Sequence, residues 1–169
     1  NNVVYDLAFS DDGKYLISGS ADKSAKIWQV NNNFTLSDTI TFHTNYVYAV
    51  NIIKHAGRYL AVTAGFDNKI ALYDMQKRQI VKSDRSEYKL KYLATNQHLK
   101  HIAVSQASKE IYIYDYDLNL IQTITSDTTP TGLAYSDDGK QLIAGSLSRG
   151  IEELINIYQT KKQYQLKST

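Results

Sequence analysis

Cysteine is absent from this chain of 169 residues, so neither disulfide bonds nor thiolate metal sites are available to it. A chain without cysteine fits a reducing compartment, and we expect a cytoplasmic location. No apolar stretch approaches the roughly 18 residues that a membrane-spanning helix needs, and no signal peptide is visible, so we expect no membrane insertion. Because the chain begins at Asn1 rather than at a methionine, we expect it to be a segment of a longer protein.

Basic runs and proline are also scarce. The net charge is +2, and basic runs stop at two residues, as at Lys161-Lys162. A nucleic-acid-binding segment is indicated by blocks of about five or more like charges, so we expect no nucleic-acid partner. A single proline, 14 tyrosines and many β-branched residues favour strands over helices.

The sequence does contain an internal repeat. Ala8–Ser20 has the sequence AFSDDGKYLISGS and Ala134–Ser146 has AYSDDGKQLIAGS, with ten of 13 positions identical. The offset between them is 126 residues, which is three times 42. A period near 42 with strand-type patterning is typical of a β-propeller, in which each blade is one four-stranded sheet.

Two further copies fit between these segments, because an aromatic residue ends an alternating strand in each copy. These aromatic residues are 45, 41 and 44 residues apart, at Trp28, Tyr73, Tyr114 and Tyr158. We therefore predict an all-β chain of about four antiparallel, four-stranded blades in a single partial propeller domain. The blades are expected near residues 1–42, 43–84, 85–126 and 127–169.

The first blade can be divided into strands from its turn residues. Ser10–Lys14 forms a turn in which Gly13 supplies a positive φ. The next blade opens at Val47. The four predicted strands are Val4–Phe9, Tyr15–Ser20, Ala25–Val30 and a fourth within Phe34–Phe42.

These motifs resemble the WD-repeat family. Ser10–Gly13 and Leu16–Asp22 match the family pattern, Trp28-Gln29 keeps the Trp of its Trp-Asp pair, and Tyr73-Asp74 keeps the Asp. His43 lies four residues before Val47, as the family His lies before its first strand. The resemblance implies a ring of six to eight blades. Four blades are about half a ring, so we expect missing blades or another chain to close it.

A set of polar residues in the second blade imitates a nucleophile–base–acid triad. The resemblance implies a structural role for it instead: a buried His bridges a turn Asp and a strand hydroxyl, and an aromatic residue closes the chain. The first blade offers three members of the same network without its His, and we expect no catalytic residue. The expected network comprises Ser18, Asp22, Trp28, His43, Thr63, Asp67 and Tyr73.

Metal and cofactor sites are not expected. Asp11-Asp12 and Asp137-Asp138 lack the alternating spacing of a calcium loop and are interpreted as turn formers. His98 and His101 form the one close histidine pair, and without a nearby carboxylate they are interpreted as exposed hairpin residues.

Partner-binding residues are expected on the face that carries the His-bearing and Asp-bearing loops, since the resemblance implies that this face meets partners. Aromatic residues there are favoured interface anchors. The longer loop of the fourth blade, around residues 147–153, is either a recognition element or a tolerated surface insertion. The residues expected at this rim are Asn45, Tyr46, Phe66, Tyr88 and Arg149.

Two functions of different classes follow. The first is a non-catalytic scaffold that binds protein or peptide partners through loops and faces. The alternative is a lactonase-like enzyme, because Thr129–Lys140 resembles a phrase of such propellers, whose active sites lie at the central channel. The strands expected to line that channel offer Asp6, Asn51, Lys89 and Lys91 but no cluster of His or Glu, so we expect a protein that is not an enzyme.

Overall fold

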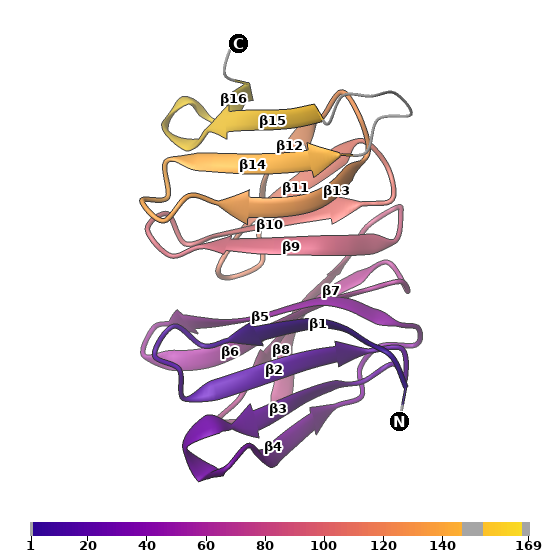
Figure 1. Ribbon diagram of the computed structural model, residues 1–169, viewed down its shortest axis with the longest axis vertical. Coiled ribbons are helices and arrows are strands. Elements are labelled where there is room, and N and C mark those ends of the chain that lie inside the picture. Colours follow the sequence, from indigo (N-terminus) through magenta and orange to yellow (C-terminus); the bar gives the residue numbers. More distant parts are fainter. Residues whose placement is uncertain (1, 147–153, 167–169) are drawn as a thin grey trace. The chain divides into compact units, whose positions relative to one another are not determined.

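The computed structural model describes residues 2–146 and 154–166, which form four sheets of four strands each (Figure 1). Sheet A contains β1 (Val4–Phe9), β2 (Tyr15–Ser20), β3 (Ala25–Gln29) and β4 (Thr35–Ile40). Sheet B contains β5 (Val47–His55), β6 (Arg58–Gly65), β7 (Lys69–Asp74) and β8 (Gln79–Arg85). Sheet C contains β9 (Leu90–Asn96), β10 (His101–Gln106), β11 (Glu110–Asp115) and β12 (Leu120–Thr125). Sheet D contains β13 (Pro130–Tyr135), β14 (Gln141–Ser146), β15 (Leu154–Gln159) and β16 (Gln165–Leu166).

In each sheet the strands follow one another in chain order, which is the arrangement of a propeller blade. The all-β prediction is therefore confirmed, and so are the first two strands of the first blade. The third strand ends at Gln29 rather than Val30, because a short 3₁₀ turn (η1, Val30–Asn32) begins there. Gly13 has φ +68° in the predicted turn, and Gly139 has φ +67° at the matching place in sheet D.

Irregularities in strand pairing recur from sheet to sheet, which supports one repeated unit. A register shift occurs early in the first strand pair of three sheets, at Val4/Asp6, Val47/Ala49 and Pro130/Gly132. Another occurs beside the repeat aromatic, at Ile27/Trp28, Leu72/Tyr73 and Ile113/Tyr114. Such bulges bend a strand and increase its twist, so each sheet is shaped in the same way.

The described chain divides into two compact units, residues 1–91 and 92–169, with the division inside β9. In the second unit, apolar residues of sheet C pack against those of sheet D. This cluster is built on Ile111, Ile113, Leu142, Ala144 and Tyr158.

In the first unit, one face of sheet A packs against sheet B. Ile17 and Ile27 lie opposite each other in the β2–β3 pairing and are almost fully buried with Val50 and Ile52 of β5. β1 also lies beside β5 (Figure 1). The backbone N–H of Val50 donates to Asp6 Oδ2 at 2.8 Å, so one of the polar residues expected to line a channel also joins the two sheets.

Glycine is required where the two sheets approach most closely. A Cβ added to Gly19 would lie 2.9 Å from Val50 Cγ1 and 3.0 Å from the carbonyl oxygen of Val47. Gly145 occupies the corresponding position of sheet D, next to the same bulge, and a Cβ there would meet nothing within 4 Å.

We therefore expect Gly19→Ala to lower the free energy of unfolding by about 1–3 kcal/mol, the usual cost of overpacking. Gly145→Ala is the matched control and is expected to be neutral or slightly stabilising, because alanine restricts the unfolded chain. Urea unfolding of the two variants, followed by circular dichroism, measures the difference. Equal stability of both variants would contradict the close packing of sheet A on sheet B.

Candidate functional site

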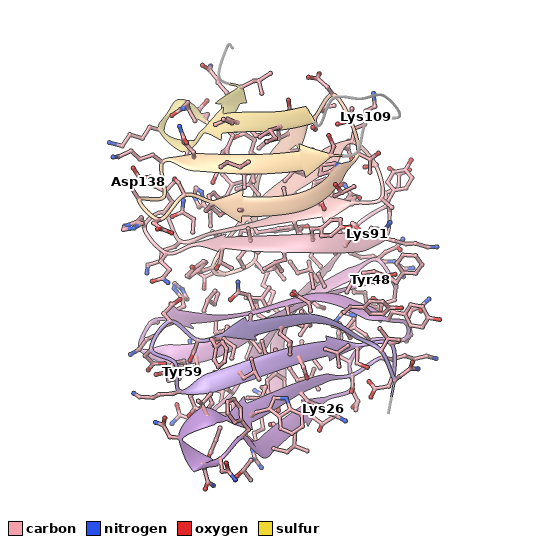
Figure 2. The ribbon with its side chains drawn as sticks, viewed as in Figure 1. Lys26, Tyr48, Tyr59, Lys91, Lys109 and Asp138 are labelled. Carbon is pink, nitrogen blue, oxygen red and sulfur yellow. The ribbon has the colours of Figure 1, made fainter. Side chains whose placement is uncertain are left out.

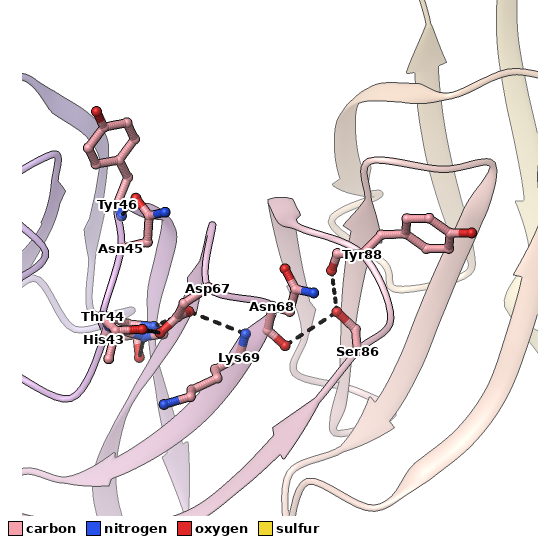
Figure 3. A network of polar contacts seen from close by, with 10 residues as sticks. His43, Thr44, Asn45, Tyr46, Asp67, Asn68, Lys69, Ser86 and Tyr88 are labelled. Carbon is pink, nitrogen blue, oxygen red and sulfur yellow. Dashed lines mark hydrogen bonds and ion pairs between the residues drawn. The ribbon is translucent and has the colours of Figure 1, made fainter.

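A buried polar network connects the two loops at one end of sheet B (Figure 3). His43, in the loop before β5, lies with Nδ1 2.9 Å from Asp67 Oδ1 and Nε2 2.9 Å from Thr63 Oγ1. The backbone N–H of Thr44 donates to Asp67 Oδ2 at 2.9 Å, and that of Lys69 donates to Oδ1 at 3.3 Å. Asp67 belongs to the β6–β7 turn, so its carboxylate ties this turn to the β4–β5 loop.

The environment determines the protonation states of this network. Burial lowers the pKa of His43 and outweighs the opposite effect of Asp67, so the imidazole is neutral near pH 7. Burial alone would raise the pKa of Asp67, but hydrogen bonds from His43 and the Thr44 backbone lower it overall. A neutral imidazole then donates from Nδ1 to the carboxylate and accepts the Thr63 hydroxyl at Nε2. Both ring nitrogens of His43 therefore have a hydrogen-bond partner.

Close packing around the pair excludes any larger residue at Gly65. A Cβ there would lie 2.7 Å from His43 Nδ1, 2.8 Å from Asp67 Oδ1 and 3.0 Å from the carbonyl oxygen of Tyr46. The glycine that ends β6 therefore lets the histidine and the aspartate meet.

Tyr73 does not occupy the place expected for it. Its hydroxyl donates to Asp38 Oδ2 of β4 at 2.5 Å, rather than to Thr63. Tyr73 faces Ala61 in the β6–β7 pairing, so Thr63 is its diagonal neighbour. An indole N–H projects sideways toward such a neighbour, whereas a tyrosine hydroxyl at the tip of the ring passes it and reaches the next sheet. Burial and the bond to Asp38 raise the pKa of Tyr73 to about 12.

In sheet A the expected network is split in two. Trp28 Nε1 donates to Ser18 Oγ at 3.2 Å across the same diagonal. Asp22 is not part of this pair. Within its own turn it accepts hydrogen bonds from the Ser24 hydroxyl at 2.6 Å and from the Ser24 backbone N–H at 3.0 Å. Both bonds lower the pKa of Asp22, and the bond from the Ser24 hydroxyl has the larger effect.

Serine takes the place of His43 in sheets C and D, which the sequence interpretation missed. Ser86 and Ser126 also lie four residues before a first strand, at Leu90 and Pro130. Both are buried; Ser126 Oγ accepts a bond from Asn156 Nδ2 at 2.8 Å. Ser86 Oγ donates to the carbonyl oxygen of Tyr88 (Figure 3). Counting four residues back from the start of each first strand would have identified both serines from the sequence.

An aromatic surface is defined here as Tyr5, Tyr46, Tyr48 and Phe66. It lies beside the network, because Tyr46 and Phe66 belong to the two loops that the network joins. Tyr5 and Tyr48 stack with ring centroids 4.2 Å apart, and Phe66 lies 5.1 Å from Tyr48 and 6.1 Å from Tyr46. The Nζ of Lys89 lies 3.9 Å from the centroid of Phe66, a cation–π contact. The backbone N–H of Phe66 donates to the carbonyl oxygen of Tyr46 at 2.8 Å, which joins the two loops that carry these rings.

The structure brings together only part of the expected rim. Tyr46 and Phe66 meet in the aromatic surface, and the side chain of Asn45 accepts the N–H of Tyr46 at 2.8 Å. Tyr88 is 44% exposed, and its ring points away from Tyr46 (Figure 3). Arg149, with the long loop around it, lies outside the described residues. Tyr5 was not expected to join the rim residues.

The two neighbouring histidines have different environments. His98 is exposed, and its Nε2 lies 3.0 Å from the carbonyl oxygen of Asp137. The expectation of an exposed His101 is wrong: it is half-buried, with Nδ1 2.5 Å from the hydroxyl of Tyr164, and burial lowers its pKa. Within residues 2–146 and 154–166, no three His, Asp or Glu side chains gather as metal ligands. Helices long and apolar enough to cross a bilayer are absent from the described part of the chain.

The neutral state of His43 makes stability depend on pH. Its folded pKa lies below the ordinary value of 6.5, so below that pH the unfolded chain binds more protons than the folded chain. We expect the free energy of unfolding to fall between about pH 8 and pH 5, with a slope of up to about 1.4 kcal/mol per pH unit from this residue. His43→Gln should flatten this slope in urea titrations at several pH values. An unchanged slope would mean that His43 titrates normally.

Comparison with known proteins agrees with this architecture. The family model "WD domain, G-beta repeat" matches residues 1–29 and 34–74, which contain the four strands of sheet A and the first three strands of sheet B. Jouberin from Rattus norvegicus and Jouberin from Mus musculus are each 32% identical over 78 residues, 46% of this chain. The chain spans 7% of the length of those relatives. Residues 1–74 therefore match WD repeats, and sheets C and D repeat the strand order of this matched region, so all four sheets have the form of WD-repeat propeller blades.

Proposed function

We propose that this chain is a non-catalytic scaffold that binds a protein or peptide partner on its aromatic surface. WD-repeat domains in general serve as protein-interaction scaffolds. The observation that carries the proposal is the gathering of Tyr5, Tyr46, Tyr48 and Phe66 at one loop-bearing end of sheets A and B. Tyrosine and phenylalanine are enriched in interface centres because they bury a large area at a small cost in side-chain entropy.

The exposure of these rings fits a binding surface. Tyr5 and Tyr46 are each 38% exposed, so each ring keeps part of its face in solvent while its neighbours hold it in place. Lys89 contributes a cation beside the rings, and the hydroxyl of Tyr46 supplies a polar contact. A partner segment with an apolar side chain flanked by hydrogen-bonding groups has the matching chemistry.

The polar network below the surface supports the same role. The bonds of Asp67 to His43 and Thr44 hold together the loops that carry Tyr46 and Phe66. A surface held in this way loses little conformational freedom when a partner binds, which favours affinity.

We also propose that a further four-stranded sheet covers the face of sheet A that lies opposite sheet B. Asp6 and Ala8 of β1 point toward sheet B, so Leu7 and Phe9 point away from it. They are 58% and 55% exposed, and Leu36 of β4 is 46% exposed. Uncovered apolar faces of this kind are interaction sites in soluble proteins.

A photo-crosslinking experiment tests the aromatic surface. A benzoylphenylalanine in place of Asn45, beside Tyr46, should crosslink a partner that mass spectrometry identifies. The purified partner should then bind the native chain, and Tyr46→Ala or Phe66→Ala should weaken binding by about 30-fold, the effect of losing about 2 kcal/mol at an interface centre.

Phe34→Ala provides the control, because Phe34 is 50% exposed in the loop between β3 and β4 and has no part in the aromatic surface. It should leave the affinity unchanged. The proposal fails if Tyr46→Ala and Phe66→Ala bind as the native chain does while retaining its circular dichroism spectrum.

A further inference from the structure

A cavity lies between sheets A and B, at the end of the strands opposite the aromatic surface. Its volume is about 430 Å³, within the range of binding pockets for small ligands and peptide side chains. Figure 2 shows Tyr59 of the cavity wall and Tyr48 of the aromatic surface at opposite ends of the strands. The two sites therefore have separate lining residues and are open to independent tests.

The inner wall of the cavity is apolar and well ordered by its contacts. Ile27 is 1% exposed and belongs to the core between the sheets, and Met75 packs against that core. The rings of Tyr15 and Tyr59 meet edge to face with centroids 5.0 Å apart. The hydroxyl of Tyr59 donates to Asp12, which holds its ring against the opposite sheet. An aliphatic side chain fits this wall.

The carboxylates around the cavity are already occupied. Asp38 accepts the hydroxyl of Tyr73 at 2.5 Å and lies 3.5 Å from Arg78 Nε. Asp74 accepts Arg58 Nη1 at 3.0 Å and two backbone N–H groups of the following turn, at 3.0 and 2.9 Å. Both acids therefore already accept hydrogen bonds from donors of the chain itself.

The donors around the cavity are only partly used. Among the described residues, Arg58 donates one hydrogen bond, to Asp74, and its side chain is 39% exposed. The side-chain amides of Gln29 and Gln76 are exposed at the cavity and make no hydrogen bond within the described chain. The unused hydrogen-bonding capacity therefore includes guanidinium and amide N–H groups, which suit a carboxylate or a backbone carbonyl, together with the two amide oxygens.

Gln29 contributes one of the unpaired hydrogen-bond donors at the cavity. It takes the place of the aspartate in the repeat's aromatic–Asp pair, which Tyr73-Asp74 retains in sheet B. In sheet B that aspartate is 0% exposed and binds Arg58 and the turn. In sheet A a glutamine at the same position is exposed, and it adds an uncharged donor to the cavity instead of a negative charge.

We propose that this cavity binds an extended peptide segment in which an aliphatic side chain stands between carboxylate side chains. The aliphatic group packs on Ile27 and Met75, and the carboxylates accept N–H groups from Arg58 and Gln29. This site is additional to the aromatic surface and does not depend on it.

Met75 is the single methionine of the sequence, so a methionine-methyl ¹³C label reports on the cavity directly. The probe is the peptide acetyl-Ala-Glu-Leu-Glu-Ala-amide, titrated into the 1–169 chain. We expect a saturable shift of the Met75 methyl resonance. Acetyl-Ala-Gln-Leu-Gln-Ala-amide should bind at least about tenfold more weakly, because it lacks charge-assisted hydrogen bonds. Absence of a saturable shift, or equal binding of the two peptides, would overturn the proposal.

Paired charge variants test the rim without touching the core. Gln29→Glu combined with Gln76→Glu should weaken the acidic peptide by about tenfold or more, whereas Gln29→Lys combined with Gln76→Lys should bind it at least as tightly as the native chain. Tyr46→Ala should leave the Met75 response intact, since it alters only the aromatic surface. If both charge variants bind the peptide alike, or if Tyr46→Ala abolishes the response, the cavity is not the site.

Discussion

Sheet A and sheet B bury apolar side chains against each other, and this packing positions both candidate sites of residues 1–91. Ile17 and Ile27 contact the β5 side chains Val50 and Ile52 because alternate residues of each strand point to one face. Gly19 permits the approach, and Asp6 adds a hydrogen bond across it. The loops at the two ends of the strands are consequently held at defined distances, which is what allows residues of different strands to form one site.

A hydrogen-bond network satisfies the polar groups that this packing buries, namely those of His43, Asp67 and Thr63. Burying a carboxylate and an imidazole is unfavourable unless each polar atom has a partner. Here the carboxylate takes bonds from the ring and from backbone N–H groups, and the ring takes the threonine hydroxyl. The arrangement resembles a catalytic triad in composition and in hydrogen bonding. It differs in burial, because Thr63 is 0% exposed and its hydroxyl is not open to a substrate. The network holds together the two loops that carry Tyr46 and Phe66.

Departures from the repeat pattern explain features that the pattern itself does not supply. Tyrosine in place of tryptophan at position 73 moves a hydrogen bond from Thr63 to Asp38 in the other sheet. Glutamine in place of aspartate at position 29 leaves an exposed amide at the cavity between the sheets. The same repeat unit thus produces a structural contact in one sheet and a candidate binding group in the other.

From the sequence alone, the repeat period and turn residues determined the all-β class, the four-stranded unit and the bounds of the first two strands, because these depend on local alternation and on turn conformations such as that of Gly13. The pairing of His43 with Asp67 and Thr63 was expected from the family resemblance. The gathering of Tyr5 and Tyr48 with Tyr46 and Phe66, the half-buried state of His101 and the cavity beside Met75 were decided by tertiary structure. Each depends on how far one strand is offset from another and on how closely two sheets approach, and neither quantity is encoded in the alternation of a single strand.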